Sequence, residues 1–323
     1  MPPLLTIGVP VYNSMPYLRE AIESLFSQTV STFKIVAIVR DSSDGSLEYL
    51  RSIRDSRLRI IQDATPGLTH ALNRMLHESD TPWLVRQDAD DISYPARIET
   101  VLKSIEQFPD AGMFYSFAEY HPANSCVGTF RCTRGTPEQL RQCVKAGYLL
   151  SICHPTVVLN VSKTVAIGSY RTDLEVEDAD LWWRMALQYD VRMIPEVLVG
   201  YRQSMTSLTA NNLLKQCVHG IYVQYLLLSS LWNVRPKPIE AVELTLQQLV
   251  RIQDLQAKEK LRFFNICLGN KEYIRACAQF ISSFLTSPGY FVRRCADEFG
   301  RKDRITNGVD PMLFLQRRTV LWP

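Results

Sequence analysis

Three carboxylates gather within four positions of the chain, at Asp88, Asp90 and Asp91. They follow the apolar run Trp83–Val85, so we expect them where a strand ends. Carboxylates at such a place repel one another unless a cation or a donor-rich ligand lies among them. Oxygen ligands favour Mg²⁺ or Mn²⁺ over zinc. The acids alone support equally well an acidic turn that caps a helix beginning near Pro95.

The elements expected around these acids alternate between strands and helices. Strands are predicted over 4–9, 33–39, 58–61, 83–85 and 111–117, and helices over 16–28, 47–53, 68–76 and 95–108. This alternation predicts an α/β fold with a mostly parallel, doubly wound sheet and helices on both faces, which binds ligands beyond the carboxyl ends of its strands. The turns at 12–14, 40–46 and 88–91 all follow strands and should share one rim. That position favours a ligand site over an accidental acidic turn.

The remainder of the chain changes character after residue 210. Before that point we expect a strand near 156–159, a helix over 177–188 and two short strands around Pro195. After it the pattern predicts helices only, over 211–232, 238–265, 270–286 and 288–299. The predicted domains are therefore an α/β domain over 1–210 and an all-helical region over 211–323. The second region is expected to serve oligomerisation or membrane-surface association.

The composition is that of a globular protein, with 46% hydrophobic and 21% charged residues among 323. Residues 1–210 carry 20 Lys and Arg against 24 Asp and Glu, whereas residues 211–323 carry 16 against 9. An acidic first part suits cation binding, and a basic second part suits phosphates or an anionic membrane. Eight cysteines without a C-x-x-C pair predict reduced thiols. Because we find no signal peptide, we expect a cytoplasmic protein, peripheral at the inner membrane face at most, without a nucleic-acid partner.

Eight short motifs occur in the order found in one family. They are V-P-V-Y-N at 9–13, D-G-S at 44–46, G-L-T-H-A-L-N at 67–73, D-A-D-D-I-S-Y-P-A-R-I-E at 88–99, H-P-T-V-V at 154–158, G-S-Y at 168–170, E-D-A-D-L-W-W-R at 177–184 and Y-R at 201–202. Over residues 4–207 the chain resembles the family-2 inverting glycosyltransferases of the GT-A fold.

The resemblance implies a nucleotide-sugar donor, with a UDP-sugar favoured, and a glycan or lipid-linked acceptor. The residues that it assigns to the donor are Pro10, Val11, Tyr12, Asn13, Asp41, Asn73 and Asp88, with Tyr12 against the base and Asn73 and Asp88 toward the ribose or sugar. Asp90 would coordinate a divalent cation, Mn²⁺ or Mg²⁺, that bridges the diphosphate. This cation offsets the charge of the departing group. Asp91 would hold the loop.

Asp178 matches the acid that the family uses as general base. A sugar hydroxyl is a poor nucleophile, so a carboxylate must take its proton as it attacks. A single displacement of this kind inverts the anomeric centre. Glu177 and Trp182 are expected on the acceptor side, although an acidic first turn also complements a helix dipole.

Several positions depart from the family pattern. Val39 and Arg40 stand where two adjacent acids are usual, with Asp41 one place later; Leu72 replaces a common Arg, and Ser204 stands near a usual metal-binding His. These departures motivate an alternative, a degenerate member that binds a nucleotide sugar or a partner protein without turnover. A nucleotidyltransferase is disfavoured, because the first turn lacks a Gly-rich, basic loop.

Basic and aromatic residues of the tail form a further group, which would suit an anionic membrane surface. Its members are Arg293, Arg294, Arg301, Lys302, Arg304, Arg317 and Arg318, with Tyr290, Phe291, Phe299, Phe314 and Trp322. A helical packing or oligomer-forming region explains the same residues equally well.

Overall fold

The computed structural model describes residues 4–121, 128–202, 213–299 and 306–322. The chain forms two compact units. The first contains residues 1–121, 152–173 and 184–202, and the second contains 122–151, 174–183 and 203–323. The sequence-based boundary at residue 210 between two domains stays a prediction.

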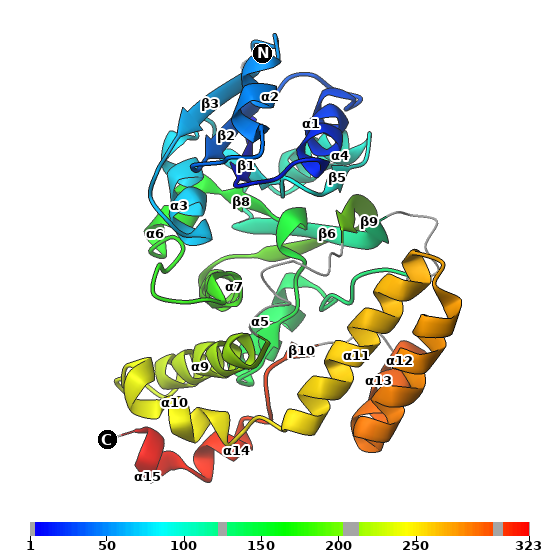
Figure 1. Ribbon diagram of the computed structural model, residues 1–323. Coiled ribbons are helices and arrows are strands. Elements are labelled where there is room, and N and C mark those ends of the chain that lie inside the picture. Colours follow the sequence, from blue (N-terminus) through cyan, green and yellow to red (C-terminus); the bar gives the residue numbers. More distant parts are fainter. Residues whose placement is uncertain (1–3, 122–127, 203–212, 300–305, 323) are drawn as a thin grey trace. The chain divides into compact units, whose positions relative to one another are not determined.

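An eight-stranded sheet in the order β3-β2-β1-β4-β8-β6-β9-β5 forms the centre of the first unit (Figure 1). Six strands run in one direction, and β8 and β5 run against them. The mostly parallel sheet predicted from the sequence is therefore confirmed. The strands are Leu5–Val11 (β1), Lys34–Val39 (β2), Leu58–Gln62 (β3), Trp83–Arg86 (β4), Ile92–Ser93 (β5), Met113–His121 (β6), Val158–Asn160 (β8) and Val191–Arg202 (β9).

Amphipathic helices cover this sheet. They are Tyr17–Phe26 (α1), Ser46–Ser52 (α2), Leu68–Glu78 (α3), Arg97–Gln107 (α4) and Val161–Ala166 (α6), with a 3₁₀ turn at His154–Thr156 (η1). Their apolar residues recur at helical spacing, as Leu18, Ile22 and Leu25 do in α1, and these three side chains are buried. They pack with alternate residues of β1, among them Ile7 and Val9. The core therefore fixes the strands whose ends carry the predicted site.

Two strand predictions were wrong in detail. We expected β1 to stop before Pro10, but it continues to Val11 beside β2. Pro10 is tolerated because β4 pairs with β1 only as far as Gly8, so the N–H that proline lacks has no partner strand there. The two short strands expected around Pro195 are one strand, β9, whose register beside β6 shifts between Ile194 and Val197. A bulge accommodates the proline.

The second unit is mostly helical. Its elements are Pro137–Lys145 (α5), Leu149–Leu150 (β7), Leu213–Leu231 (α9), Ile239–Gln247 (α10), Ile252–Gly269 (α11), Tyr273–Thr286 (α12), Pro288–Phe299 (α13), Thr306–Asn307 (β10), Met312–Leu315 (α14) and Arg318–Leu321 (α15). The helix Glu177–Gln188 (α7) begins in this unit. The single helix expected over 238–265 is two, because Leu249 and Val250 donate to carbonyls three residues earlier and end α10. A two-residue strand, β10, pairs with β7 in a region expected to be helical only.

Gln224, which is fully buried in α9, joins three segments of the second unit. Its Nε2 donates to the carbonyl oxygens of Gly147 at 2.8 Å and of Val309 at 2.7 Å, and its Oε1 accepts the Val309 N–H at 2.8 Å. A Cβ at Gly308 would meet this Oε1 at 2.4 Å. The side chain therefore ties the chain near residue 309 to α9.

We expect Gln224→Leu to lower the free energy of unfolding by about 3 kcal/mol, because it leaves three buried backbone groups without partners. Urea unfolding followed by circular dichroism measures this loss. The matched control is Gln256→Leu, whose native side chain is exposed on α11. Equal unfolding midpoints for the two variants would show that the buried amide contributes nothing.

Candidate functional site

The turns after β1 and β2 lie together at the carboxyl edge of the sheet. The N–H of Asn13 donates to Ser42 Oγ at 3.1 Å, and its Oδ1 accepts the Ser43 N–H at 2.9 Å. The Met15 N–H donates to Asp44 Oδ2 at 2.7 Å. Asn13 has a φ of 45°, which asparagine tolerates better than most residues. The predicted rim is confirmed for these two turns, and part of the Asn13 amide serves to join them.

An exposed tyrosine stands at this edge beside an arginine. The Tyr12 side chain is 53% exposed, and the Arg40 guanidinium carbon lies 3.5 Å from the centre of its ring. This cation–π contact orients the ring that the family resemblance assigns to the base. Asp41 is exposed next to it, whereas Val11 is buried in β1. Arg40, which stands where the family usually has an acid, thus takes part in orienting Tyr12.

The acidic loop follows β4, the strand beside β1. Asp88 and Asp90 are partly exposed, and Asp91 is buried. The Asp91 Oδ1 accepts the Arg202 N–H at 2.7 Å, and the Arg202 Nε donates to the Asp90 carbonyl oxygen at 2.8 Å. Gln87 Nε2 donates to the carbonyl oxygens of Asp88 and Asp91. Asp91 therefore holds the loop, whereas Asp88 and Asp90 remain partly exposed.

Two buried arginines, for which the sequence motifs predicted no role, support this loop. The Arg86 side chain is 3% exposed and pairs with Asp88. Arg97 donates to Gln87 Oε1 at 2.7 Å and to the Arg86 carbonyl oxygen at 2.7 Å. A signal was available, since a charged residue at the end of an apolar strand must find a partner when it is buried. The arginines compensate much of the negative charge of the loop.

Burial and mutual repulsion raise the pKa values of the acids. Burial, together with the charge of Asp88, raises the pKa of Asp90 to about 6. Burial and the two neighbouring carboxylates raise the pKa of Asp91 well above its ordinary value. Arg86 and Arg202 oppose the rise at Asp90. A cation beside Asp90 would stabilise its ionised form further.

The acidic loop offers carboxylate oxygens of the kind that a divalent cation takes as ligands. Among residues 4–121, 128–202, 213–299 and 306–322 there is no group of three His, Cys, Asp or Glu placed to bind a metal. Ser204, which replaces the usual histidine, lies outside these ranges. Mg²⁺ commonly takes one or two carboxylates and completes its shell with substrate phosphates and water. Asp90, whose carboxylate is partly exposed and has a raised pKa, suits that arrangement.

Asn73 fastens the G-S-Y turn to α3. Its Nδ2 donates to the Tyr170 carbonyl oxygen at 2.8 Å, and its Oδ1 accepts the Tyr170 N–H at 3.0 Å. The Tyr170 hydroxyl lies 3.0 Å from His154 Nε2. Burial, and then the charge of Arg86, lower the pKa of His154 well below its ordinary value. Both polar atoms of the Asn73 amide therefore contact the Tyr170 backbone, and His154 is a neutral structural residue.

The predicted base lies in the first turn of α7, within the second unit. Asp178 is partly exposed, and its Oδ1 accepts the N–H of Ala179 at 2.7 Å. Glu177 is buried beside it, and the preceding Glu175 pairs with Lys215 of α9. Trp182 is 1% exposed, so its indole belongs to the core in this structure and presents no open face to a sugar.

Comparison with known sequences gives one family. Residues 6–125 match the model of glycosyl transferase family 2. The chain is 30% identical over 194 residues to an uncharacterized glycosyltransferase of Haemophilus influenzae, a match that covers 58% of this chain and 70% of that one. A second match, to EpsE of Bacillus subtilis, has 28% identity over 200 residues and covers 56% of this chain and 66% of that one.

Solved structures share the fold at low sequence identity. TarS residues 1–349 of S. aureus in complex with UDP-GlcNAc superposes with a TM-score of 0.53 at 13% identity, covering 89% of this chain and 92% of that one. The mannosyltransferase PcManGT of Pyrobaculum calidifontis in complex with GDP-Man and Mn²⁺ gives 0.52 at 16% identity, covering 93% and 80%.

Proposed function

The chain belongs to glycosyltransferase family 2 and has its GT-A fold, and we propose that it transfers a hexosyl or N-acetylhexosaminyl group with inversion to a glycan or lipid-linked hydroxyl. The donor is a nucleoside-diphosphate sugar. The observation that carries the proposal is the acidic loop after β4, where Asp90 has a raised pKa at the ligand-binding edge of the sheet. Such transfers build polysaccharides, which is the process that we propose for this chain.

Several residues of the first unit have a proposed task in binding the donor and the cation. Asp90 holds a divalent cation, and Asp88, fixed by Arg86, faces the sugar or ribose. Tyr12, oriented by Arg40, packs against the base, with a uracil donor favoured. A cation held by Asp90 would offset negative charge on the departing diphosphate. Arg86, Arg97 and Arg202 keep the loop in shape before the donor arrives, which preserves binding energy for catalysis.

Asp178 is the proposed general base. Its partial exposure is consistent with that task, and the match of E-D-A-D-L-W-W-R to the family supports it. The carboxylate takes the proton of the acceptor hydroxyl as that oxygen attacks the anomeric carbon. Glu177, buried at the same helix start, is proposed to support the acceptor side through its neighbour.

A screen of nucleotide sugars by thermal unfolding tests the donor class. UDP- and GDP-sugars are compared with and without Mn²⁺, because the solved relatives bind donors of both kinds. A donor at about 100 times its dissociation constant adds about 2.7 kcal/mol to the free energy of unfolding. We expect stabilisation by a subset of donors in Mn²⁺ and weak binding of Mn²⁺ alone. Tight Mn²⁺ binding to the empty chain in calorimetry would contradict the shared cation site.

The rate of transfer should fall as the pH drops through about 6 at low Mn²⁺, because protonated Asp90 cannot ligate a metal. Saturating Mn²⁺ competes with the proton and should move the midpoint to lower pH. The pH–rate profile of kcat/KM for the donor at two Mn²⁺ concentrations measures this shift. A midpoint that is the same at both Mn²⁺ concentrations would show that a group other than Asp90 titrates.

The raised pKa of Asp90 affects the stability of the chain without donor or cation in the opposite direction: the free energy of unfolding should increase, not decrease, as the pH falls. Between pH 6 and about 4 the folded chain holds a proton on Asp90 that the unfolded chain, with a pKa near 3.8, has released. Asp90 therefore makes the free energy of unfolding rise as the pH falls through this window. The comparison of native chain and Asp90→Asn in urea isolates this contribution.

A further inference from the structure

We propose that the outward face of α12 binds the surface of an anionic lipid bilayer. On α12, Ile274 and Leu285 are 89% and 72% exposed, and Ile281, one helical turn before Leu285, is exposed as well. These residues and Ala278 follow spacings of four, three and four, which places them in one stripe along a helix. Cys277 and Phe284 are exposed beside the stripe.

The opposite face of α12 is already packed. Ala276 and Ser283 are buried, and Ser283 Oγ donates to the Ala257 carbonyl oxygen of α11 at 2.8 Å. The ring of Phe280 lies 5.2 Å from Phe264 of α11 and 4.8 Å from Phe291 of α13. Figure 1 shows α11, α12 and α13 running beside one another. The apolar stripe is therefore additional to the residues that hold the three helices together, and exposed patches of this kind mark interaction surfaces.

The charge around the stripe selects its partner. Residues 211–323 carry 16 Lys and Arg against 9 Asp and Glu, and three of these arginines, at 275, 293 and 294, lie on α12 and α13 between the acids Glu272 and Asp297. The Arg275 side chain is 78% exposed, and its ion pair with Glu272 is open to solvent, as is the 3.3 Å pair of Arg293 with Asp254. Exposed ion pairs of this kind contribute little to stability, so the guanidinium groups of Arg275 and Arg293 can turn to lipid phosphates.

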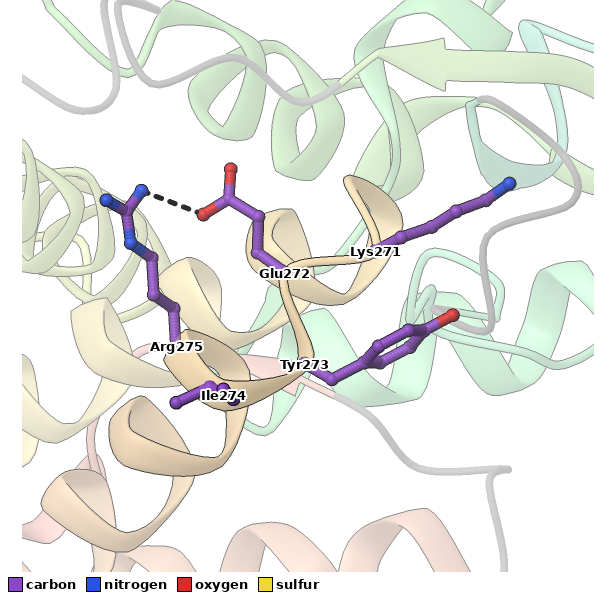
Figure 2. Close-up of a pocket in the computed structure, with 5 residues that line it drawn as sticks. All are labelled: Lys271, Glu272, Tyr273, Ile274 and Arg275. Carbon is purple, nitrogen blue, oxygen red and sulfur yellow. Dashed lines mark hydrogen bonds and ion pairs between the residues drawn. The ribbon is translucent and has the colours of Figure 1, made fainter.

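The start of α12 shows how apolar and basic groups are arranged (Figure 2). Arg275 reaches back to Glu272, and Tyr273 points away from this pair. The hollow there has a volume of about 350 Å³ and is lined only by the consecutive residues 271–275. It is a shallow surface feature, which suits contact with a broad partner. No helix within the described parts of the chain combines the length and apolar character needed to cross a bilayer, so the contact is interfacial.

Vesicle flotation of the full chain tests the proposal. We expect it to float with vesicles of phosphatidylcholine and phosphatidylglycerol, and much less with phosphatidylcholine alone. The double variant Ile281→Glu/Leu285→Glu should lower the partition coefficient about tenfold or more, because it puts two charges into the apolar contact. The matched control is Leu244→Glu, which changes an equally exposed leucine of α10 and should float like the native chain.

Three results would overturn the proposal. They are no flotation of the native chain, equal flotation of the double variant, or a concentration-dependent dimer that the double variant abolishes in the absence of lipid. The last result would assign the face to a second copy. Circular dichroism confirms that each variant folds, and donor stabilisation in Mn²⁺ is recorded separately, so failure here leaves the proposed transfer reaction unaffected.

The native thiol of Cys277 gives a second measurement without substitutions. Among the cysteines that the structure describes, it is the exposed one. Anionic vesicles should slow its reaction with a maleimide about tenfold, a level that mass spectrometry of the labelled peptide can follow. An unchanged labelling rate on floating protein would place the membrane contact on another surface.

Discussion

Asp178→Asn should lower the rate of sugar transfer by about 10²- to 10⁴-fold, because an amide of the same shape cannot accept the proton of the acceptor hydroxyl. Donor binding in Mn²⁺ should remain close to that of the native chain, since the proposed task of Asp178 concerns the acceptor. The rate of nucleoside-diphosphate release in the presence of acceptor, together with thermal stabilisation by the donor, measures both effects.

The control for this substitution is Glu243→Gln, which makes the same chemical change at an exposed carboxylate of α10 in the same unit. It should transfer at the native rate. A native rate in Asp178→Asn would assign the base to another residue. A joint loss of rate and donor stabilisation would instead show that Asp178 shapes the donor site.

Asp90→Asn should reduce transfer by about 10³-fold, because the diphosphate then departs without a cation that is worth several kcal/mol in the transition state. The variant should also lose the effect of Mn²⁺ on donor binding. Isothermal titration of a nucleoside diphosphate with and without Mn²⁺ separates these two consequences.

Asp110→Asn serves as the control, since Asp110 is exposed after α4 and the change is the same. It should keep the native response to Mn²⁺. An Asp90→Asn chain that still binds donor more tightly in Mn²⁺ would place the cation on Asp88. Its folded state should not be weakened, because removal of a carboxylate with a raised pKa relieves repulsion in the empty loop.

The sheet could be predicted because apolar periods and turn residues agree with each other along residues 4–117. Buried runs such as that of β2 have no competing helical period, and each ends at residues that form turns. Local sequence patterns predict the structure less well where tertiary contacts determine it. Pro10 is compatible with β1 only because the pairing with β4 ends at Gly8. The break between α10 and α11 contains no glycine or proline that would predict it.

The carboxylates of the site could be proposed from sequence, but their supports could not. Arg86, Gln87 and Arg97 form one buried network only once β4 and the start of α4 have been brought together. Asn73 was expected to face the donor, and its contacts with Tyr170 depend on a partner 97 residues away. The burial of Trp182 likewise follows from packing that spacing within α7 does not specify.

The most direct test of the account is the release of nucleoside diphosphate from a panel of UDP- and GDP-sugars by the native chain, with water alone or with a panel of glycan and lipid-linked acceptors, in Mn²⁺ and in EDTA. We predict Mn²⁺-dependent release from at least one donor, lost in EDTA and in both Asp90→Asn and Asp178→Asn, and kept in Asp110→Asn and Glu243→Gln. Equal, negligible release by the native chain and both active-site variants with every donor would contradict the assignment as an active transferase. Donor binding without turnover would then indicate a degenerate member of the family.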